Sequence, residues 1–235
     1  MSVDRWFGPG MAHAIHTGVT PVDHLPRTAL PVLQGVPRHL SSHLQRLQAG
    51  ASAMGRTVDW LPGIEVEIIH WLSLVTLKMD KALRLVLHPD DGLVSAKLGP
   101  LPSAPQSYRL IPMPHPLRER QSETTLVHKG LSGPWSQEVL STVRPVGADD
   151  ALLLWADGTV AETAIASVGI EQGDLLMLPP LQGRVASLAE RLDLPGWASS
   201  RGLRLEIGPF TLPSPGAGQV WCMNALRGIW SATLL

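Results

Sequence analysis

Two charged residues of this sequence have neighbours that suit chemistry on a carbonyl group. Lys129 lies between the apolar stretch Leu126-Val127 and Gly130-Leu131. An amine beside apolar side chains loses hydration, which favours its neutral form, and a neutral amine can form an imine with an aldehyde. A lone lysine at a strand end is more often a solvated surface charge, so this position matters only in combination with a second group.

Glu162 is that second group. It lies in a predicted hairpin, with an apolar strand over residues 151–155, a turn at Asp157-Gly158 and a returning strand over residues 159–167. Its neighbours are small or apolar, so we expect the carboxylate to be partly buried and to need a partner. A protonated ring nitrogen is one such partner. The alternative is an edge-strand carboxylate that faces water.

Arg46 and two backbone segments could bind a phosphate. Arg46 lies one turn into a predicted helix over residues 43–54, and a guanidinium grips a phosphate through two hydrogen bonds. Gly183 precedes a predicted short helix over residues 185–192, and Asn224-Ala225 lies in a turn between two predicted strands, so backbone N–H groups could meet a phosphate at both places. An imine-forming lysine, an acid for a ring nitrogen and an arginine for a phosphate together suggest a pyridoxal phosphate (PLP) enzyme.

The composition excludes several other classes. Of 235 residues, 44% are hydrophobic and 17% charged, which is typical of a globular domain rather than a disordered chain. The formal net charge of −1 gives no reason to expect nucleic-acid binding. One cysteine, Cys222, excludes a disulfide within the chain, and no signal peptide or membrane span is recognisable, so we expect a cytoplasmic protein without membrane contact. His13 and His16 lack further ligands nearby, so we expect no metal site.

The predicted elements fall into two groups. The first half alternates strands and helices, whereas the second half is mostly strands with a helix over residues 135–143. Between them lies Pro112-Met113-Pro114-His115-Pro116, where three prolines in five residues predict a linker. We therefore expect an α+β fold with a small α/β domain over residues 1–114 and a larger β-rich domain over residues 115–235. In the first half the expected elements are strands around a turn at Gln34-Gly35, helices over residues 43–54 and about 63–79, and strands over residues 82–88 and 107–111.

In their order along the chain these motifs resemble the class IV aminotransferases, the PLP enzymes of fold type IV, and most of all the 4-amino-4-deoxychorismate lyases among them. Four stretches carry the resemblance: Thr28-Ala29 through Gly35 to His43-Leu44-Gln45-Arg46-Leu47, then His128-Lys129, then the hairpin from Ala148-Asp149-Asp150 to Glu162-Thr163, and finally Cys222-Met223-Asn224-Ala225-Leu226-Arg227-Gly228.

The resemblance implies a two-domain homodimer with PLP between the domains of each chain. It makes Lys129 the Schiff-base lysine and general base, Glu162 the partner of the pyridine nitrogen, and Thr28 a second catalytic residue. The implied cofactor-binding set is completed by Arg46, Ser167, Arg184, Val185, Asn224 and Ala225. The sequence has Ser167 where the family usually has Asn, and Pro134 where many aminotransferases have a tyrosine.

Three activities remain open at this point. The first is a lyase that forms 4-aminobenzoate and pyruvate for folate synthesis. The second is an aminotransferase that acts on a branched-chain or D-amino acid, and the third is a relative that has lost catalysis. The missing tyrosine weakens the aminotransferase more than the lyase. The sequence does not show which arginines would bind substrate carboxylates.

Overall fold

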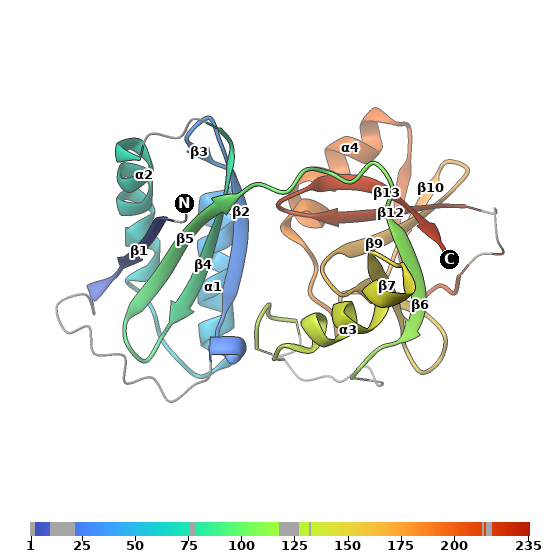
Figure 1. The fold of residues 1–235 in the computed structure, drawn as a ribbon, viewed down its shortest axis with the longest axis horizontal. Helices are drawn as coiled ribbons and strands as arrows, with labels where there is room; N and C mark the ends of the chain where they lie inside the picture. The colour runs from blue at the N-terminus through green and yellow to red at the C-terminus, as the bar shows by residue number, and fades with distance from the viewer. Residues whose placement is uncertain are drawn as a thin grey trace. The chain divides into compact units, whose positions relative to one another are not determined.

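The chain folds into two compact units, each built on its own sheet (Figure 1). The structure, a computed structural model, describes residues 3–9, 22–75, 79–117, 127–131, 133–212, 214 and 218–235. The first unit comprises Met1–Pro102 and His128–Gly133, and the second comprises Ser103–Val127 and Pro134–Leu235. The segment with Lys129 therefore belongs to the first unit, although it follows the first strand of the second unit in sequence.

The first unit is an antiparallel five-stranded sheet with two helices. Its strands follow the order β1-β5-β4-β2-β3. The turn between β2 and β3 is the predicted one, and Gln34 and Gly35 both have positive φ, as a tight hairpin requires. The strands are β1 (Val3–Phe7), β2 (Arg27–Leu33), β3 (Val36–Pro37), β4 (Lys81–His88) and β5 (Leu93–Pro100), and the helices are α1 (Leu40–Ala53) and α2 (Ile64–Leu74).

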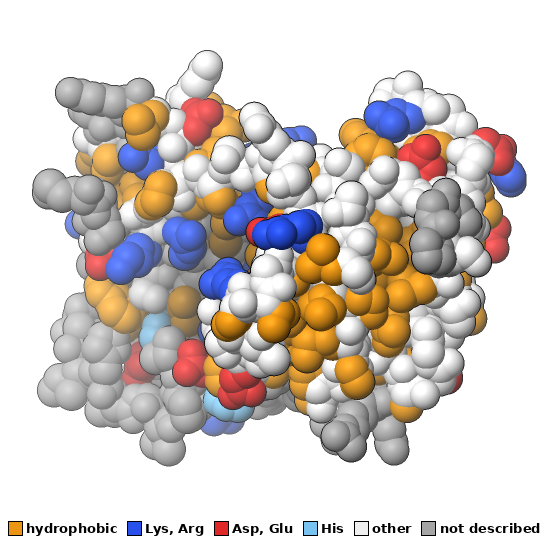
Figure 2. Space-filling view, turned by 45° about the vertical axis from the view of Figure 1, so that its right-hand side comes forward, with side chains coloured by type: hydrophobic (Ala, Val, Ile, Leu, Met, Phe, Trp, Pro, Cys, Tyr) orange, Lys and Arg blue, Asp and Glu red, His pale blue; other side chains and the backbone are white. Residues whose placement is uncertain are grey.

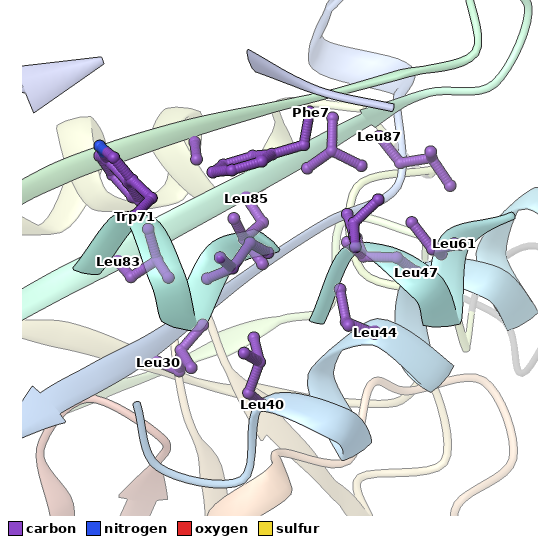
Figure 3. Packing of buried hydrophobic residues seen from close by; sticks show 14 of the residues in the cluster. Phe7, Leu30, Leu40, Leu44, Leu47, Leu61, Trp71, Leu83, Leu85 and Leu87 are labelled. Carbon is purple, nitrogen blue, oxygen red and sulfur yellow. The ribbon is translucent and has the colours of Figure 1, made fainter. Parts of the chain in front are cut away.

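Both helices pack on one leucine-rich core of this sheet (Figure 3). Leu44 and Leu47 of α1 contribute to it, as their helical spacing predicts, and Leu83 and Leu85 of β4 contribute from the sheet. Helix α2 ends at Leu74, earlier than the predicted end near residue 79, and residues 76–78 lie outside the described residues. The strands β1 and β5 have no counterpart among the predicted elements.

The second unit is an eight-stranded sheet with the order β11-β10-β9-β12-β13-β6-β7-β8. One face of the sheet forms its own core, to which Leu152 and Cys222 belong. The opposite face packs against α3 through Leu153 and against α4 through Met223, so successive residues serve the two faces. The elements are β6 (Arg109–Pro114), α3 (Trp135–Val143), β7 (Asp150–Leu154), β8 (Val160–Thr163), β9 (Ser167–Gln172), β10 (Leu175–Leu178), a π-helix (Ala189–Asp193), α4 (Leu194–Ser200), β11 (Arg204–Ile207), β12 (Gln219–Asn224) and β13 (Gly228–Leu234).

The predicted linker over residues 112–116 is wrong, because β6 continues to Pro114 inside this sheet. β6 pairs with β7 from Leu110 to Pro114, but with β13 only at Arg109 and Leu110. The Leu110 carbonyl accepts from the Leu235 N–H, so the backbone groups of Leu110 point toward β13. In a strand the backbone groups of every second residue point to the same side, so those of Pro112 and Pro114 also face the β13 side. Pro112 and Pro114 lie beyond the end of β13, where no N–H is needed.

Both units combine helices with sheets, and the predicted α+β class is confirmed. Within the parts of the chain that the structure describes, no helix is long and apolar enough to cross a membrane.

Candidate functional site

Lys129 is held in a tight turn of the first unit. The backbone N–H of Arg27, the first residue of β2, donates to the Lys129 carbonyl at 3.1 Å. The next residue, Gly130, has φ +105°, and a Cβ at that position would lie 2.1 Å from the carbonyl oxygen of Leu25. Only glycine fits both the dihedral and the close approach. The tight turn at Lys129-Gly130 therefore fixes the backbone position from which the Lys129 side chain extends.

The surroundings of Lys129 disfavour the protonated, charged form of its amine. The pKa of its amine falls from the ordinary value of 10.5 to about 8. Desolvation is the largest cause, followed by the positive charges of Arg46, Arg27 and Arg84, in that order. The residue as a whole is nevertheless exposed. Solvent therefore reaches part of the side chain, while the surrounding protein accounts for the desolvation. About a tenth of such amines are neutral at pH 7, which is enough for nucleophilic attack.

Arg46 and Thr28 belong to the same cluster through His43. His43 and Arg46 lie three residues apart on α1, on one face of the helix. The Thr28 hydroxyl oxygen is 2.6 Å from Nδ1 of His43, and both side chains are buried. Burial lowers the pKa of His43 to about 3, with further contributions from Arg46 and Lys129, so the ring is neutral at physiological pH. The first unit thus brings together Lys129, Arg46 and Thr28, the three site residues predicted in it.

Glu162 lies in the second unit and is buried, at 6% exposure, so the water-facing alternative is wrong. Burial raises the pKa of its carboxyl. The opposing influences are His115, whose Nε2 is 3.7 Å from Oε1 of Glu162, the positive charge of Arg184, and the backbone N–H of Val185. The distance to His115 is too long for a good hydrogen bond. A buried carboxylate with such partners is suited to a cationic ligand.

The predicted return strand over residues 159–167 is interrupted one residue after Glu162, by a turn that hydrogen bonds fix in place. β8 ends at Thr163, whose hydroxyl accepts from the Ala166 N–H at 2.9 Å. The buried carboxylate of Asp150 accepts from the Ala164 N–H at 3.0 Å and from the Tyr108 hydroxyl at 3.1 Å. These hydrogen bonds change the direction of the chain before β9 begins, and they fix the backbone next to Glu162.

The predicted positions Asn224 and Ser167 are joined to this turn. The Asn224 amide donates to the Ile165 carbonyl at 3.3 Å, while its side-chain oxygen accepts from the N–H groups of Leu226 and Arg227. Asn224 therefore shapes the turn that contains Ala225 and attaches it to the Glu162 turn. The Ser167 hydroxyl accepts from the backbone N–H of Ser187 at 2.8 Å, which fixes the segment around Val185.

Arg184 is buried in an ion pair inside the second unit. Its guanidinium donates to both carboxylate oxygens of Glu190, at 2.8 and 2.7 Å, and to the carbonyls of Pro179 and Pro180. Neither charged side chain is open to solvent beyond 6%. The Arg184 side chain is thus occupied within the protein, which leaves its backbone N–H as the group for its predicted role at a cofactor.

A family model described as amino-transferase class IV matches residues 28–235. The chain belongs to the class IV aminotransferase family. This family consists of PLP-dependent lyases and aminotransferases, so the protein is an enzyme of that kind. A search of curated protein sequences gave no match.

Solved structures of this family have the same fold. A hypothetical aminotransferase from Mycobacterium tuberculosis in its PLP-bound form has a TM-score of 0.78 at 20% identity, over 99% of this chain and 91% of that chain. The 4-amino-4-deoxychorismate lyase from Pseudomonas aeruginosa has a TM-score of 0.71 at 19% identity, over 99% and 91%. A putative branched-chain amino acid aminotransferase from Thermotoga maritima has a TM-score of 0.78 at 16% identity, over 100% and 86%. Identities this low establish the fold and not the substrate.

The residues of this class IV aminotransferase fit the three groups by which PLP is held. An amine with a lowered pKa, Lys129, suits the aldehyde, and the buried carboxylate of Glu162 suits a protonated ring nitrogen. The positive charges that act on Lys129, from Arg46, Arg27 and Arg84, suit the phosphate and other anionic groups.

Four contributors to these clusters were missed in the sequence. His115 lay in the stretch predicted as a linker, and His43 was quoted in the helix motif without a role. Arg27 and Arg84 lie on neighbouring strands, and the β2–β4 register puts Ala29 opposite Arg84, which no sequence spacing shows. In the described parts of the chain there is no group of three or more potential metal ligands.

Proposed function

We propose that this class IV aminotransferase is a PLP-dependent 4-amino-4-deoxychorismate lyase, which forms 4-aminobenzoate and pyruvate. The motif order, the Asn224-Ala225-Leu226 turn and the likeness to the Pseudomonas aeruginosa lyase support this substrate. The cofactor supplies an electron-withdrawing pyridinium ring that stabilises negative charge on the substrate carbon.

Lys129 is the residue that bonds covalently to the PLP aldehyde. With a pKa of about 8, its amine can take a proton from the substrate carbon that bears the nitrogen and remain able to release it. A lysine with the ordinary pKa would hold its own proton almost completely at pH 7. The lowered pKa therefore supports both of its roles, as attachment point and as general base.

Glu162 holds the proton on the pyridine nitrogen through its negative charge. Arg46 binds the phosphate, with backbone N–H groups near Val185 and Ala225 as further donors. Arg27 and Arg84, which act on Lys129 electrostatically, are the candidates for the substrate carboxylates.

The observation that carries the choice of lyase is the identity of the hydroxyl group near Lys129. The only tyrosine of the chain, Tyr108, is buried in the second unit, bonded to Asp150, with its pKa raised by burial. The Thr28 hydroxyl, by contrast, is bonded to His43, whose pKa is lowered in part by Lys129. Thr28 can thus donate a proton to the departing pyruvate fragment, with the neutral ring of His43 orienting its hydroxyl.

The test is a product assay on the PLP-loaded protein with 4-amino-4-deoxychorismate. We expect 4-aminobenzoate and pyruvate in equal amounts, and a rate about 10²-fold lower in Thr28→Val, the usual size of a general-acid contribution. The control is Thr233→Val, at an exposed threonine of β13 that pairs with Arg109 of β6 in the second unit. Absence of 4-aminobenzoate from a PLP-loaded protein would contradict the proposal.

The second candidate is an aminotransferase acting on a branched-chain or D-amino acid, favoured by the Thermotoga maritima structure. It predicts transfer of an amino group to a 2-oxo acid, without 4-aminobenzoate. The third alternative, a relative that has lost catalysis, is set aside because the chain belongs to a family of PLP-dependent enzymes. We also propose a homodimer, because hydrophobic side chains gather over one face of the second unit (Figure 2), and light scattering in solution tests it.

A further inference from the structure

His115 is a buried histidine that has no role in the proposed function. Its backbone N–H donates to the Leu154 carbonyl at 2.7 Å, so the pairing of β6 with β7 continues through it. The ring is 1% exposed and stacks on Trp155, with ring centroids 4.4 Å apart and an interplanar angle of 27°. The Trp135 ring contacts the imidazole at a tilt of 50°, with ring centroids 5.2 Å apart. The imidazole is therefore held in one orientation.

The two ring nitrogens of His115 have different partners. The Leu117 N–H donates to Nδ1 at 3.1 Å, so in the neutral ring the hydrogen is on Nε2. Nε2 is buried and has no hydrogen-bond partner among the residues that the structure describes. It lies 3.7 Å from Oε1 of Glu162, and a side-chain shift of about 0.7 Å makes this a normal hydrogen bond.

Among the residues that the structure describes, no cation is dedicated to Glu162, so its carboxylate needs such a donor. The arginine that acts on it electrostatically there is Arg184, and the guanidinium of Arg184 is bonded to Glu190 through both carboxylate oxygens. The remaining groups that favour the ionised form are His115 and the backbone N–H of Val185. A buried carboxylate without donors takes up a proton, and a protonated carboxyl could not hold a charged ring nitrogen.

We propose that His115 is a positioning residue for Glu162: its Nε2–H donates to one carboxylate oxygen, keeps the carboxylate ionised and leaves the second oxygen to the pyridine nitrogen of PLP. The inference rests on the proposed function, since the ring nitrogen as partner of Glu162 belongs to it. A neutral imidazole suits this task because it supplies a hydrogen-bond donor without a positive charge that would compete with the pyridinium.

The first test uses the protein without PLP. His115→Phe keeps a ring on Trp155 but removes the donor, and His115→Gln replaces Nε2–H by an amide N–H. Carbon NMR of labelled glutamate carboxyls, assigned with Glu162→Gln, gives the pKa of Glu162. We expect His115→Phe to raise it by about one unit or more and His115→Gln to reverse part of the rise. An unchanged pKa in His115→Phe would overturn the proposal.

The second test is PLP affinity. The dissociation constant of PLP should rise about tenfold in His115→Phe, as one pKa unit implies, and recover in His115→Gln. The matched control is His88→Phe, since His88 also contacts a tryptophan ring, Trp6, but lies in the first unit. Equal affinities in wild type and His115→Phe would refute the positioning role. Failure of the wild type to bind PLP would refute the proposed function instead, while the titration of Glu162 still decides whether His115 supports it.

A third measurement needs no substitution at His115, in case His115→Phe does not fold. Nitrogen NMR of the wild type distinguishes a protonated from an unprotonated ring nitrogen. The proposal predicts hydrogen on Nε2 of His115 at neutral pH, with its shift altered in Glu162→Gln. The opposite tautomer, with hydrogen on Nδ1, would refute it.

Discussion

Replacing Arg184 should destabilise the second unit strongly. Arg184 and Glu190 are 0% and 6% exposed and share two short hydrogen bonds. Arg184→Met leaves the Glu190 carboxylate buried without its partner and removes the donors to Pro179 and Pro180. Breaking one side of a buried ion pair costs about 3–5 kcal/mol, whereas replacing both sides by apolar residues is often close to neutral.

Three variants test the contribution of this ion pair to stability: Arg184→Met, Glu190→Leu and the double variant. We expect each single variant to lower the urea midpoint by about 1–5 M, from the energy above and a typical slope of about 1–3 kcal/mol per M. The double variant should recover most of the loss. Hydrogen exchange of second-unit peptides as a function of urea follows this unit alone. Additive losses, or single losses below about 1 kcal/mol, would contradict the reasoning. A folded Arg184→Met that had lost only PLP affinity would instead make Arg184 a phosphate ligand.

Three further predictions concern the first unit. Only the unfolded state protonates His43 between pH 6.5 and about 3, so the unfolding free energy should fall by up to about 1.4 kcal/mol per pH unit as the pH drops below 6.5, and His43→Gln should lack this part of the slope. Gly130→Ala should weaken PLP binding about tenfold through backbone strain beside Lys129, whereas Gly55→Ala, also at positive φ but in open space, should not; equal affinities would contradict this. Arg46→Gln should raise the pKa of Lys129 toward 10.5, which the pH dependence of its acetylation measures; an unchanged midpoint would count against the electrostatic coupling.

Local signals in the sequence predicted much of the fold. Helix α3 begins and ends at the predicted residues, and the turns at Gln34-Gly35 and Asp157-Gly158 are where their glycines indicate. Strand β5 was missed although all eight of its residues pair with the neighbouring β4. Only its other edge, which pairs with β1 near residue 5, depends on a segment far away in the sequence.

The charged residues of the candidate site could be predicted from the sequence, but the residues that hold them in place could not. Lys129 and Glu162 were identified by the types of their neighbours. The side chain of Arg184, a residue that the family resemblance places at the cofactor, is bonded to Glu190 of the π-helix, and no sequence pattern indicated this ion pair. His115 was hidden by the prolines around it, whose effect on β6 depends on where β13 ends. Such dependence on distant strands is not written in any local pattern.

Covalent binding of PLP by Lys129 underlies every role proposed above. The most direct measurement is incubation with PLP, reduction with borohydride and mapping of the modified peptide by mass spectrometry. The chain has four lysines, Lys78, Lys81, Lys97 and Lys129. We predict modification of Lys129 in the wild type and in Lys81→Ala, and its loss in Lys129→Ala. No modification of the wild type, or modification that persists unchanged in Lys129→Ala, would contradict the account.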